Sequence, residues 1–354
     1  MKLPQIRIGN KVTTTPIIQG GMGIGVSLSR LASAVANEGG IGVISGVQIG
    51  FREADFDRNT QAANMRALAK EIRKARHLSP DGIIGVNLMV AINNYADMVR
   101  VAVEEGVDLI ISGAGLPKDL PGLVKGSDTK IAPIVSSAKA AQLITKLWLR
   151  RYDYLPDLII VEGPEAGGHL GFSFEELEGE DKPKLEDLVP EVIEALKPFE
   201  EAAGKEIPVI AAGGIYDGED IAKYLELGAS GVQMGTRFVA THECDASYEF
   251  KKAYMDSTED DIDLILSPVG LPGQAIINPF IRKVKAQKEK ITKCYNCLSP
   301  CSPKIAPYCI STALIKAVEG NVDKGLVFIG KRGYKIDKIV SVRELIQELS
   351  IVIH

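Results

Sequence analysis

The sequence contains no long hydrophobic run. No stretch approaches the roughly 18 consecutive apolar residues that a membrane-spanning helix needs, so no membrane segment is expected. The opening stretch, MKLPQIRIGN, lacks the apolar region of a signal peptide, so secretion is not expected either. No GxxxxGKS or GxxxxGKT motif occurs, which excludes an ordinary nucleotide-binding P-loop.

Positive charge and cysteine are also scarce. Lys and Arg number 41 against 46 Asp and Glu, and no dense basic run occurs. Because nucleic acid is bound mainly by basic residues that neutralise phosphates, a nucleic acid partner is not expected. The five cysteines, four of them within residues 294–309, do not form the spread framework of a small secreted fold. A reducing cytoplasm is therefore the expected location.

Short apolar runs recur along residues 1–240 and alternate with longer segments of helical periodicity. Each run is rich in Val and Ile, as is typical of a parallel strand that is buried on both faces. The eight runs lie at 16–19, 41–45, 83–90, 107–112, 131–136, 157–163, 208–214 and 231–235. Eight such units without a reversal of order favour a (βα)8 TIM barrel over an open doubly wound sheet, the competing α/β architecture.

Glycines mark the ends of three predicted helices. Gly39, Gly106 and Gly228 each stand between a helical pattern and the next apolar run. The residue after a helix often has a left-handed backbone conformation, which glycine adopts without strain. We therefore expect positive φ angles at these three positions.

The pattern changes after about residue 242. Residues 244–256 are predicted to form the last barrel helix, and few apolar runs follow them. The remainder is too poor in apolar residues to form a core of its own. We therefore expect it to be an extension of the barrel and not an independent domain. A barrel of residues 1–260 is expected to carry a C-terminal helical extension, residues 261–354, that contains the cysteines and packs on the barrel.

Within the extension, residues 267–280 are rich in Pro and Gly and are predicted to form a loop. A basic helix is expected at 281–293 and another helix near 310–319. Ser341 and Glu344 have the spacing of a capping box, which predicts that a last helix begins there.

Glycine and polar residues gather at the ends of the apolar runs. TIM-barrel active sites lie at the C-terminal ends of the strands. The candidate site residues there are Gly21, Met22, Gly23, Asn87, Ser112, Gly113, Ala114, Ser137, Glu162, Gly167, Gly168, His169, Ala212, Gly213, Gly214, Gln233, Met234, Gly235 and Thr236. They predict a surface of exposed backbone amides that fits a flat, polar ligand carrying a phosphate.

Two of these clusters, Gly213–Gly214 and Gly235–Thr236, follow the seventh and eighth runs. Barrels commonly hold phosphate at these two loops, because free amides and helix N-termini stabilise an anion. The alternative is that the glycines only form tight turns. The GGMGIG motif at 20–25 is not a dinucleotide fingerprint, because Val26 occupies the position of the third glycine.

A series of motifs resembles the nitronate monooxygenase family, formerly called 2-nitropropane dioxygenase. The motifs are, in order, PIIQGGMG, GVNLMV, SGAGLP, EGPEAGGHLG, PVIAAGGIYDG, GVQMGTRF and GLPGQAIINPF, and they span roughly residues 12–280. The family includes the flavin-dependent enoyl-acyl-carrier-protein reductase II. The resemblance implies a barrel that binds FMN non-covalently.

The resemblance also implies roles for individual residues. Gly21, Met22, Asn87 and the Ser112–Ala114 segment would surround the flavin ring, and the two clusters after runs seven and eight would hold its phosphate. His169 matches the histidine that the family uses at the flavin face. A neutral imidazole there would act as a general base toward a nitroalkane, or as a hydrogen-bond donor toward a nitronate.

The function expected from this resemblance is FMN-dependent oxidation of alkyl nitronates with O2. The alternatives within the family are an NAD(P)H-dependent enoyl-acyl-carrier-protein reductase and an NAD(P)H:quinone-type flavin reductase. A small-molecule substrate, NAD(P)H and a second copy of the chain are the partners considered. Two other classes stay open: a redox protein with a cluster beside the flavin, and a ligand-binding barrel without turnover.

The segment CYNCLSPCSPKIAPYC contains Cys294, Cys297, Cys301 and Cys309. Four thiolates could hold zinc or an iron–sulfur cluster, but the C-x2-C-x3-C-x7-C spacing matches neither common ferredoxin pattern, so no metal is expected. Cys244 is expected to be structural. Among the other histidines, His242, just after the eighth run, is the second candidate for a site residue.

Overall fold

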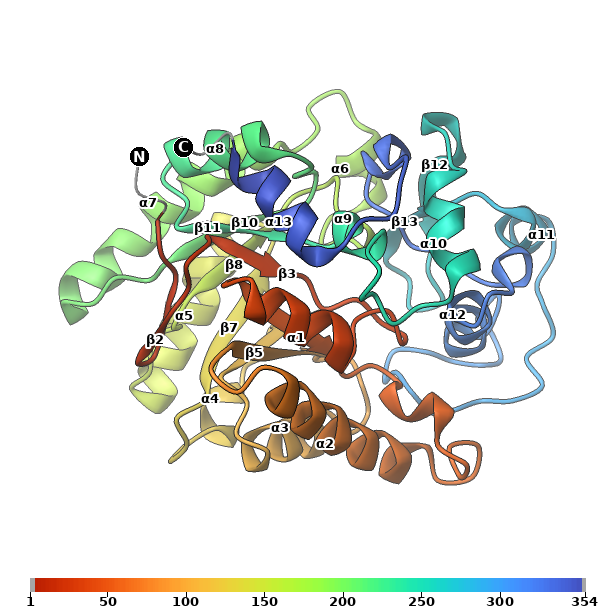
Figure 1. Cartoon of the computed structure of the whole chain (residues 1–354), viewed down its shortest axis with the longest axis horizontal. Coiled ribbons are helices and arrows are strands. Elements are labelled where there is room, and N and C mark those ends of the chain that lie inside the picture. Colours follow the sequence, from red (N-terminus) through yellow and green to blue (C-terminus); the bar gives the residue numbers. More distant parts are fainter. Residues whose placement is uncertain (1–3, 352–354) are drawn as a thin grey trace.

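The computed structural model describes residues 4–351, and its centre is a closed barrel of eight parallel strands (Figure 1). The strands are β3 (Ile17–Gln19), β4 (Ile41–Ser45), β5 (Ile83–Met89), β6 (Leu109–Gly113), β7 (Lys130–Val135), β8 (Ile159–Glu162), β10 (Val209–Ala212) and β11 (Gly231–Met234). Pairing of β11 with β3 closes the ring. Each strand overlaps one of the eight predicted runs, so the predicted TIM barrel is confirmed.

Helices alternate with the strands and cover the outside of the barrel (Figure 1). They are α1 (Ser29–Asn37), α2 (Thr60–Leu78), α3 (Tyr95–Glu104), α4 (Leu120–Leu123), α5 (Ala138–Tyr152), α7 (Leu185–Ala203) and α8 (Gly218–Glu226), with the short η1 (Ile49–Arg52) and α6 (Phe174–Glu178) in loops. The predicted left-handed glycines are confirmed, with φ of 80° at Gly39, 67° at Gly106 and 98° at Gly228.

The barrel interior is apolar, and a hairpin closes its N-terminal end. Strands β1 (Arg7–Ile8) and β2 (Lys11–Val12) form the hairpin. Ile6 and Ile8 are buried in the same cluster as Ile18, Leu109 and other side chains from the barrel strands. Because this end is filled, a ligand can enter the barrel only from the C-terminal ends of the strands.

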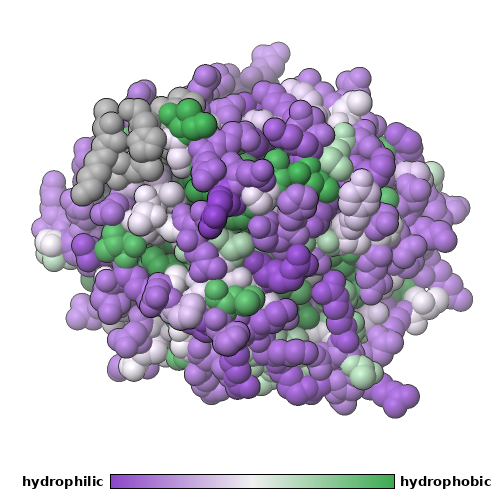
Figure 2. Space-filling view, viewed as in Figure 1, coloured by the Kyte–Doolittle hydropathy of each residue, from purple (hydrophilic) through white to green (hydrophobic). Residues whose placement is uncertain are grey.

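The outer surface in Figure 2 is mostly hydrophilic, with apolar side chains in small separate patches. Among the helices formed by residues 4–351, none is both long and apolar enough to cross a membrane.

The chain after β11 forms two antiparallel strands and several short helices. They are α9 (Thr236–Val239), α10 (Tyr248–Met255), η2 (Glu259–Asp261), β12 (Ile262–Leu266), β13 (Pro272–Ile276), α11 (Pro279–Ala286), α12 (Ile310–Val318), η3 (Val322–Lys324), η4 (Gly333–Lys335) and α13 (Val342–Ser350). The predicted helix near 310–319 is confirmed as α12. The predicted division at residue 260 stays a prediction.

Helix α13 packs against α1 and α8 and therefore takes the place of the eighth barrel helix. Its predicted capping box is confirmed, because the Ser341 hydroxyl accepts the Glu344 backbone N–H while the Glu344 carboxylate accepts the Ser341 backbone N–H. The prediction that residues 244–256 form the last barrel helix was wrong. That helix, α10, begins at Tyr248, where the Ser247 side chain caps it, and it lies in the extension.

Two other predictions for the extension were wrong. Part of the predicted loop 267–280 is strand β13, which pairs with β12 on one side and with β9 (Gly168–His169) on the other. This pairing holds residues 272–276 in an extended conformation, although the Pro and Gly content of the stretch is typical of a loop. The basic helix predicted at 281–293 ends at Ala286.

Candidate functional site

A cavity of about 280 Å³ opens at the C-terminal ends of the barrel strands. The structure brings most of the predicted site residues together around it. Those that line the cavity are Gly21, Met22, Gly23, Asn87, Gly113, Ala114, Glu162, Gly167, Gly168, His169, Ala212, Gly213, Gly214, Gln233, Met234, Gly235 and Thr236.

Ser112 and Ser137 are the two predicted residues that do not line the cavity. Successive side chains on a strand face opposite sides. The Ser112 side chain faces the helices, and its hydroxyl lies 2.8 Å from the hydroxyl of Tyr95 on α3. Ser137 is the N-cap of α5, and its hydroxyl accepts the backbone N–H of Ala140 at 3.2 Å. The hydroxyls of both serines therefore form hydrogen bonds with the outer helices α3 and α5 and not with the cavity.

Glycines that follow the C-terminal ends of β10 and β11 form one side of the cavity. Gly213 and Gly214 have φ of 91° and 84°, a region that side chains other than glycine rarely adopt. Among the described residues, the backbone N–H groups of Gly213, Gly214 and Gly235 have no hydrogen-bond partner. A Cβ at Gly214 would lie 2.6 Å from the Glu165 carboxylate, so only glycine leaves this surface open. Together these amides can hold an anion.

Two polar side chains without partners lie at the ends of β8 and β11. The buried Gln233 Oε1 accepts no hydrogen bond within the described part of the chain. Burial raises the pKa of Glu162 to about 7, so this carboxyl is protonated in part of the molecules at neutral pH. Buried polar groups in proteins are nearly always satisfied. These two groups therefore indicate that a polar ligand contacts the cavity floor.

His169 lies on β9 at the side of the cavity, where its Nε2 is 2.7 Å from the Ser267 hydroxyl oxygen. The imidazole centroid is 5.2 Å from the ring centroid of Phe328. Burial lowers the pKa of His169 to about 4, so the ring is neutral at neutral pH. With Nε2 paired to Ser267, Nδ1 has no partner among residues 4–351 and is the ring nitrogen free to contact a substrate.

The extension supplies an apolar wall to the cavity. Leu298, Ile310 and Leu314 from around α12, with Phe328, line this wall. Gln274 on β13 joins the wall to the barrel, because its Nε2 donates to Glu165 O at 3.1 Å and to backbone carbonyls nearby. The cavity therefore has a polar, amide-rich side and an apolar side.

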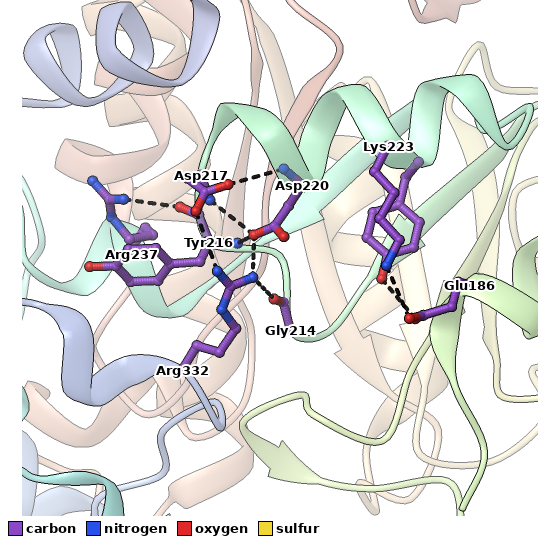
Figure 3. Close-up of polar contacts among 9 residues, drawn as sticks. Glu186, Gly214, Tyr216, Asp217, Asp220, Lys223, Arg237 and Arg332 are labelled. Carbon is purple, nitrogen blue, oxygen red and sulfur yellow. Dashed lines mark hydrogen bonds and ion pairs between the residues drawn. The ribbon is translucent and has the colours of Figure 1, made fainter. Parts of the chain in front are cut away.

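A cluster of charges borders the glycine side of the cavity (Figure 3). Arg332 donates to the carboxylates of Asp217 and Asp220 at the start of α8 and to Gly214 O at 3.2 Å. Arg237 lies 4.4 Å from the centroid of the Tyr216 ring. Lys331 also lines the cavity and, within the described residues, forms no ion pair. Its charge is therefore available to a ligand.

The other candidates lie elsewhere. His242 is exposed and does not line the cavity, so it is not a site residue in this structure. Cys244 is buried, and burial raises the pKa of its thiol to about 11, in agreement with a structural role. Of the four clustered cysteines only Cys297 lines the cavity.

Sequence reasoning missed the residues that the extension and nearby loops contribute, above all Ser267, Phe328, Lys331 and Tyr216. The only sequence signal for the first three was the KRG motif after the apolar stretch LVFIG, together with the Pro- and Gly-rich segment that contains Ser267. Neither signal indicates contact with a barrel whose last strand ends at Met234, 33 residues before Ser267 and 94 residues before Phe328.

Comparison with known proteins shows several similar enzymes. The chain is 28% identical over 306 residues to a probable nitronate monooxygenase of Staphylococcus saprophyticus, covering 78% of this chain and 79% of that protein. It is 29% identical over 271 residues to the (3aS,4S,5R,7aS)-5-hydroxy-7a-methyl-1-oxo-octahydro-1H-indene-4-carboxyl-CoA dehydrogenase of Mycobacterium tuberculosis. That match covers 77% of this chain and only 65% of the dehydrogenase.

A similar solved structure is that of FabK from Thermotoga maritima, with a TM-score of 0.72 and 29% sequence identity over 94% of this chain and 91% of that chain. The sequence model of the nitronate monooxygenase family matches residues 6–351, which include the barrel, the extension and every residue that lines the cavity. The chain therefore belongs to the nitronate monooxygenase family.

Proposed function

We propose that this chain is an FMN-dependent oxidoreductase that oxidises alkyl nitronates with O2. The observation that supports it most is the juxtaposition of the free Gly213, Gly214 and Gly235 amides with the neutral imidazole of His169 across one cavity. The amides match a phosphate, and Gln233 Oε1 offers an unused acceptor to a flat ring. The residues present therefore fit a flavin.

The cavity favours FMN over FAD. It has one glycine-rich cradle for phosphate, after β10 and β11, and the first glycine motif of the chain is not a dinucleotide fingerprint. When bound, FMN supplies the electron-transfer chemistry, and the protein supplies binding, orientation and charge.

In the proposed reaction, His169 acts on the substrate through Nδ1. Its neutral ring can accept the α-proton of a nitroalkane, or donate a hydrogen bond to a nitronate in the other tautomer. Ser267 holds the ring orientation through Nε2. The apolar wall of Leu298, Ile310 and Leu314 binds the alkyl chain and excludes water from this side of the cavity.

Reduction of an enoyl thioester by NAD(P)H is the second candidate function. The apolar wall supports it, because a small nitronate does not need a wall that extends from Leu298 to Phe328. The similarity to FabK and to a dehydrogenase of a CoA thioester supports it as well.

Anaerobic reduction of the bound flavin separates the two functions. Under the proposal, an alkyl nitronate bleaches the flavin absorption faster than NADH or NADPH does. Bleaching by a reduced nucleotide alone, followed by reoxidation with a crotonyl thioester, would replace the nitronate proposal by the reductase. No bleaching by any of these compounds would exclude both.

Lys331 gives a prediction about the flavin phosphate. The Lys331→Met variant should bind FMN about tenfold more weakly, because a hydrogen bond to a charged group contributes roughly 1.5–3 kcal/mol and part of it is screened here. Riboflavin, which lacks the phosphate, should bind both proteins equally. Titration of the apoprotein with the two flavins, followed by fluorescence quenching, measures the difference.

The matched control is Lys335→Met, which removes the same charge from a lysine that does not line the cavity. It should leave both affinities unchanged. An equal loss of FMN and riboflavin affinity in Lys331→Met would mean that Lys331 does not contact the phosphate.

A further inference from the structure

Residues 287–309, here called the cysteine segment, join α11 to α12 and contain Cys294, Cys297, Cys301 and Cys309. Apart from one bridge between Leu298 and Ile92, the segment has no regular secondary structure. Loops of this length without structure of their own are uncommon in compact domains and usually functional. The segment is nevertheless tied to the barrel, since Asn93 N–H donates to Cys297 O at 3.1 Å.

The turn between Cys294 and Cys297 is shaped around a sulfur atom. Asn296 has φ of 48°, a left-handed conformation that asparagine adopts more readily than most residues with a side chain. In this conformation its backbone N–H points to Cys294 Sγ, 3.4 Å away. Hydrogen bonds from amides to sulfur stabilise thiolates that bind iron.

The four thiols lie within electrostatic reach of one another. Burial raises the pKa of Cys301 first, and the charges of Cys297, Cys294 and Cys309 raise it further. Cys309 is the N-cap of the nine-residue α12, yet its side chain caps no backbone N–H and stays free. If all four were ionised, the thiolates would repel one another, and a positively charged centre would offset that repulsion.

The surrounding charge is positive, although the chain as a whole has a net charge of −5. Residues 282–304 contain seven Lys and Arg and a single acidic residue, Glu289. Four of the seven pair with carboxylates. Lys288, Lys290 and Lys304 form no ion pair within the described residues, so positive charge remains to offset an anionic centre.

As they stand, no three His, Cys, Asp or Glu side chains among the described residues are close enough to bind one metal ion. Around a single tetrahedral zinc, the four sulfurs would each lie about 2.3 Å from the metal and therefore close together. In a four-iron cluster each thiolate binds a different iron, so the sulfurs lie farther apart. Four thiols that are near one another in the chain, but not close enough to share one ion, match the larger centre better.

We propose that Cys294, Cys297, Cys301 and Cys309 bind an iron–sulfur cluster of the [4Fe–4S] type, contrary to the expectation of no metal from the spacing alone. Each thiol loses its proton and binds one iron, so assembly releases four protons. Cys297 and Ser311 line the cavity, so the cluster site would border it. The inference depends on the cysteine segment and not on the proposed function.

Chemical analysis of the full-length protein, expressed and purified without oxygen, tests the proposal. We expect about four iron and four acid-labile sulfide ions per chain. A broad brown absorption should underlie the flavin bands, and reduction by dithionite should produce an electron paramagnetic resonance signal that is distinct from a flavin radical.

The double variant Cys294→Ser/Cys301→Ser changes two cysteines that do not line the cavity, and it should lose the iron and sulfide and keep the flavin. Cys244→Ser, which alters the one cysteine outside the segment, should keep all three. One zinc per chain in place of iron would overturn the cluster in favour of a single ion. Wild-type protein that holds neither iron nor sulfide after anaerobic reconstitution would show that the four residues are simple thiols.

Discussion

Replacing His169 by asparagine is expected to slow the turnover of a neutral nitroalkane by about 100-fold, the usual scale for the loss of a general base. Asparagine keeps a polar group of similar size but cannot accept the proton. Turnover of the corresponding nitronate should fall less, because its α-proton has already left. Flavin content should be unchanged, since the amides of Gly213, Gly214 and Gly235 remain. Initial rates on both forms of one nitroalkane measure the contrast.

His242→Asn is the matched control, because this exposed histidine lies outside the cavity. It should leave both rates unaltered. Equal losses on the two substrate forms in His169→Asn would assign the imidazole to orientation or charge stabilisation, and unchanged rates would make it structural.

The pH dependence gives the same experiment a second readout. Because burial lowers the pKa of His169 to about 4, the proton-accepting form persists as pH falls and is lost only near that value. The contribution of His169 to the nitroalkane rate should therefore stay constant from neutral pH down to about pH 5. A loss centred near pH 6.5, the ordinary value for histidine, would show that the ring is solvated in the working enzyme.

Gly214→Asp is expected to abolish flavin binding, with an affinity loss of about 100-fold or more, because like charges brought together cost several kcal/mol. The new carboxylate would stand in the amide cradle, beside the carboxylate of Glu165 that already lies 2.6 Å from the Cβ position. The protein should be colourless after purification. Added FMN should leave its thermal unfolding midpoint unchanged, whereas it raises that of the wild type.

The control for backbone strain is Gly126→Asp. Gly126 has φ of 85°, almost the value at Gly214, but open space surrounds its Cβ position. This variant should lose some stability and keep its flavin. If Gly214→Asn loses flavin as completely as Gly214→Asp does, space and not charge decides binding. If Gly214→Asp retains its flavin, the phosphate lies elsewhere.

The barrel could be predicted from sequence because each parallel strand is buried on both faces and reads as an unbroken apolar run, as IGVIS does at β4. The position of the site followed, since barrel sites lie at the strand ends. The direction of individual side chains did not. Ser112 precedes the cavity-lining Gly113 on β6 and faces the opposite side, and strand ends that are only a few residues long hide this alternation.

The remainder of the site is formed by contacts that no local pattern reveals. Strand β13 is held by hydrogen bonds to β9, about 100 residues earlier in the chain, and β9 is only two residues long. The hydrogen bond between His169 and Ser267 depends on the same pairing. Lys331 reaches the cavity because Gly330 N–H donates to the Thr236 hydroxyl at 3.0 Å.

The position of α13 has a consequence for how the chain folds during synthesis. The helix that completes the ring around the barrel is separated from strand β11 by more than 100 residues, since β11 ends at Met234 and α13 begins at Val342, and it packs on α1 from near the start of the chain. Until residue 350 has emerged from the ribosome, the faces of α1 and α8 that pack against α13 stay exposed to solvent. Every residue that lines the cavity precedes α13 in the chain, so the cavity can form before this helix covers α1 and α8.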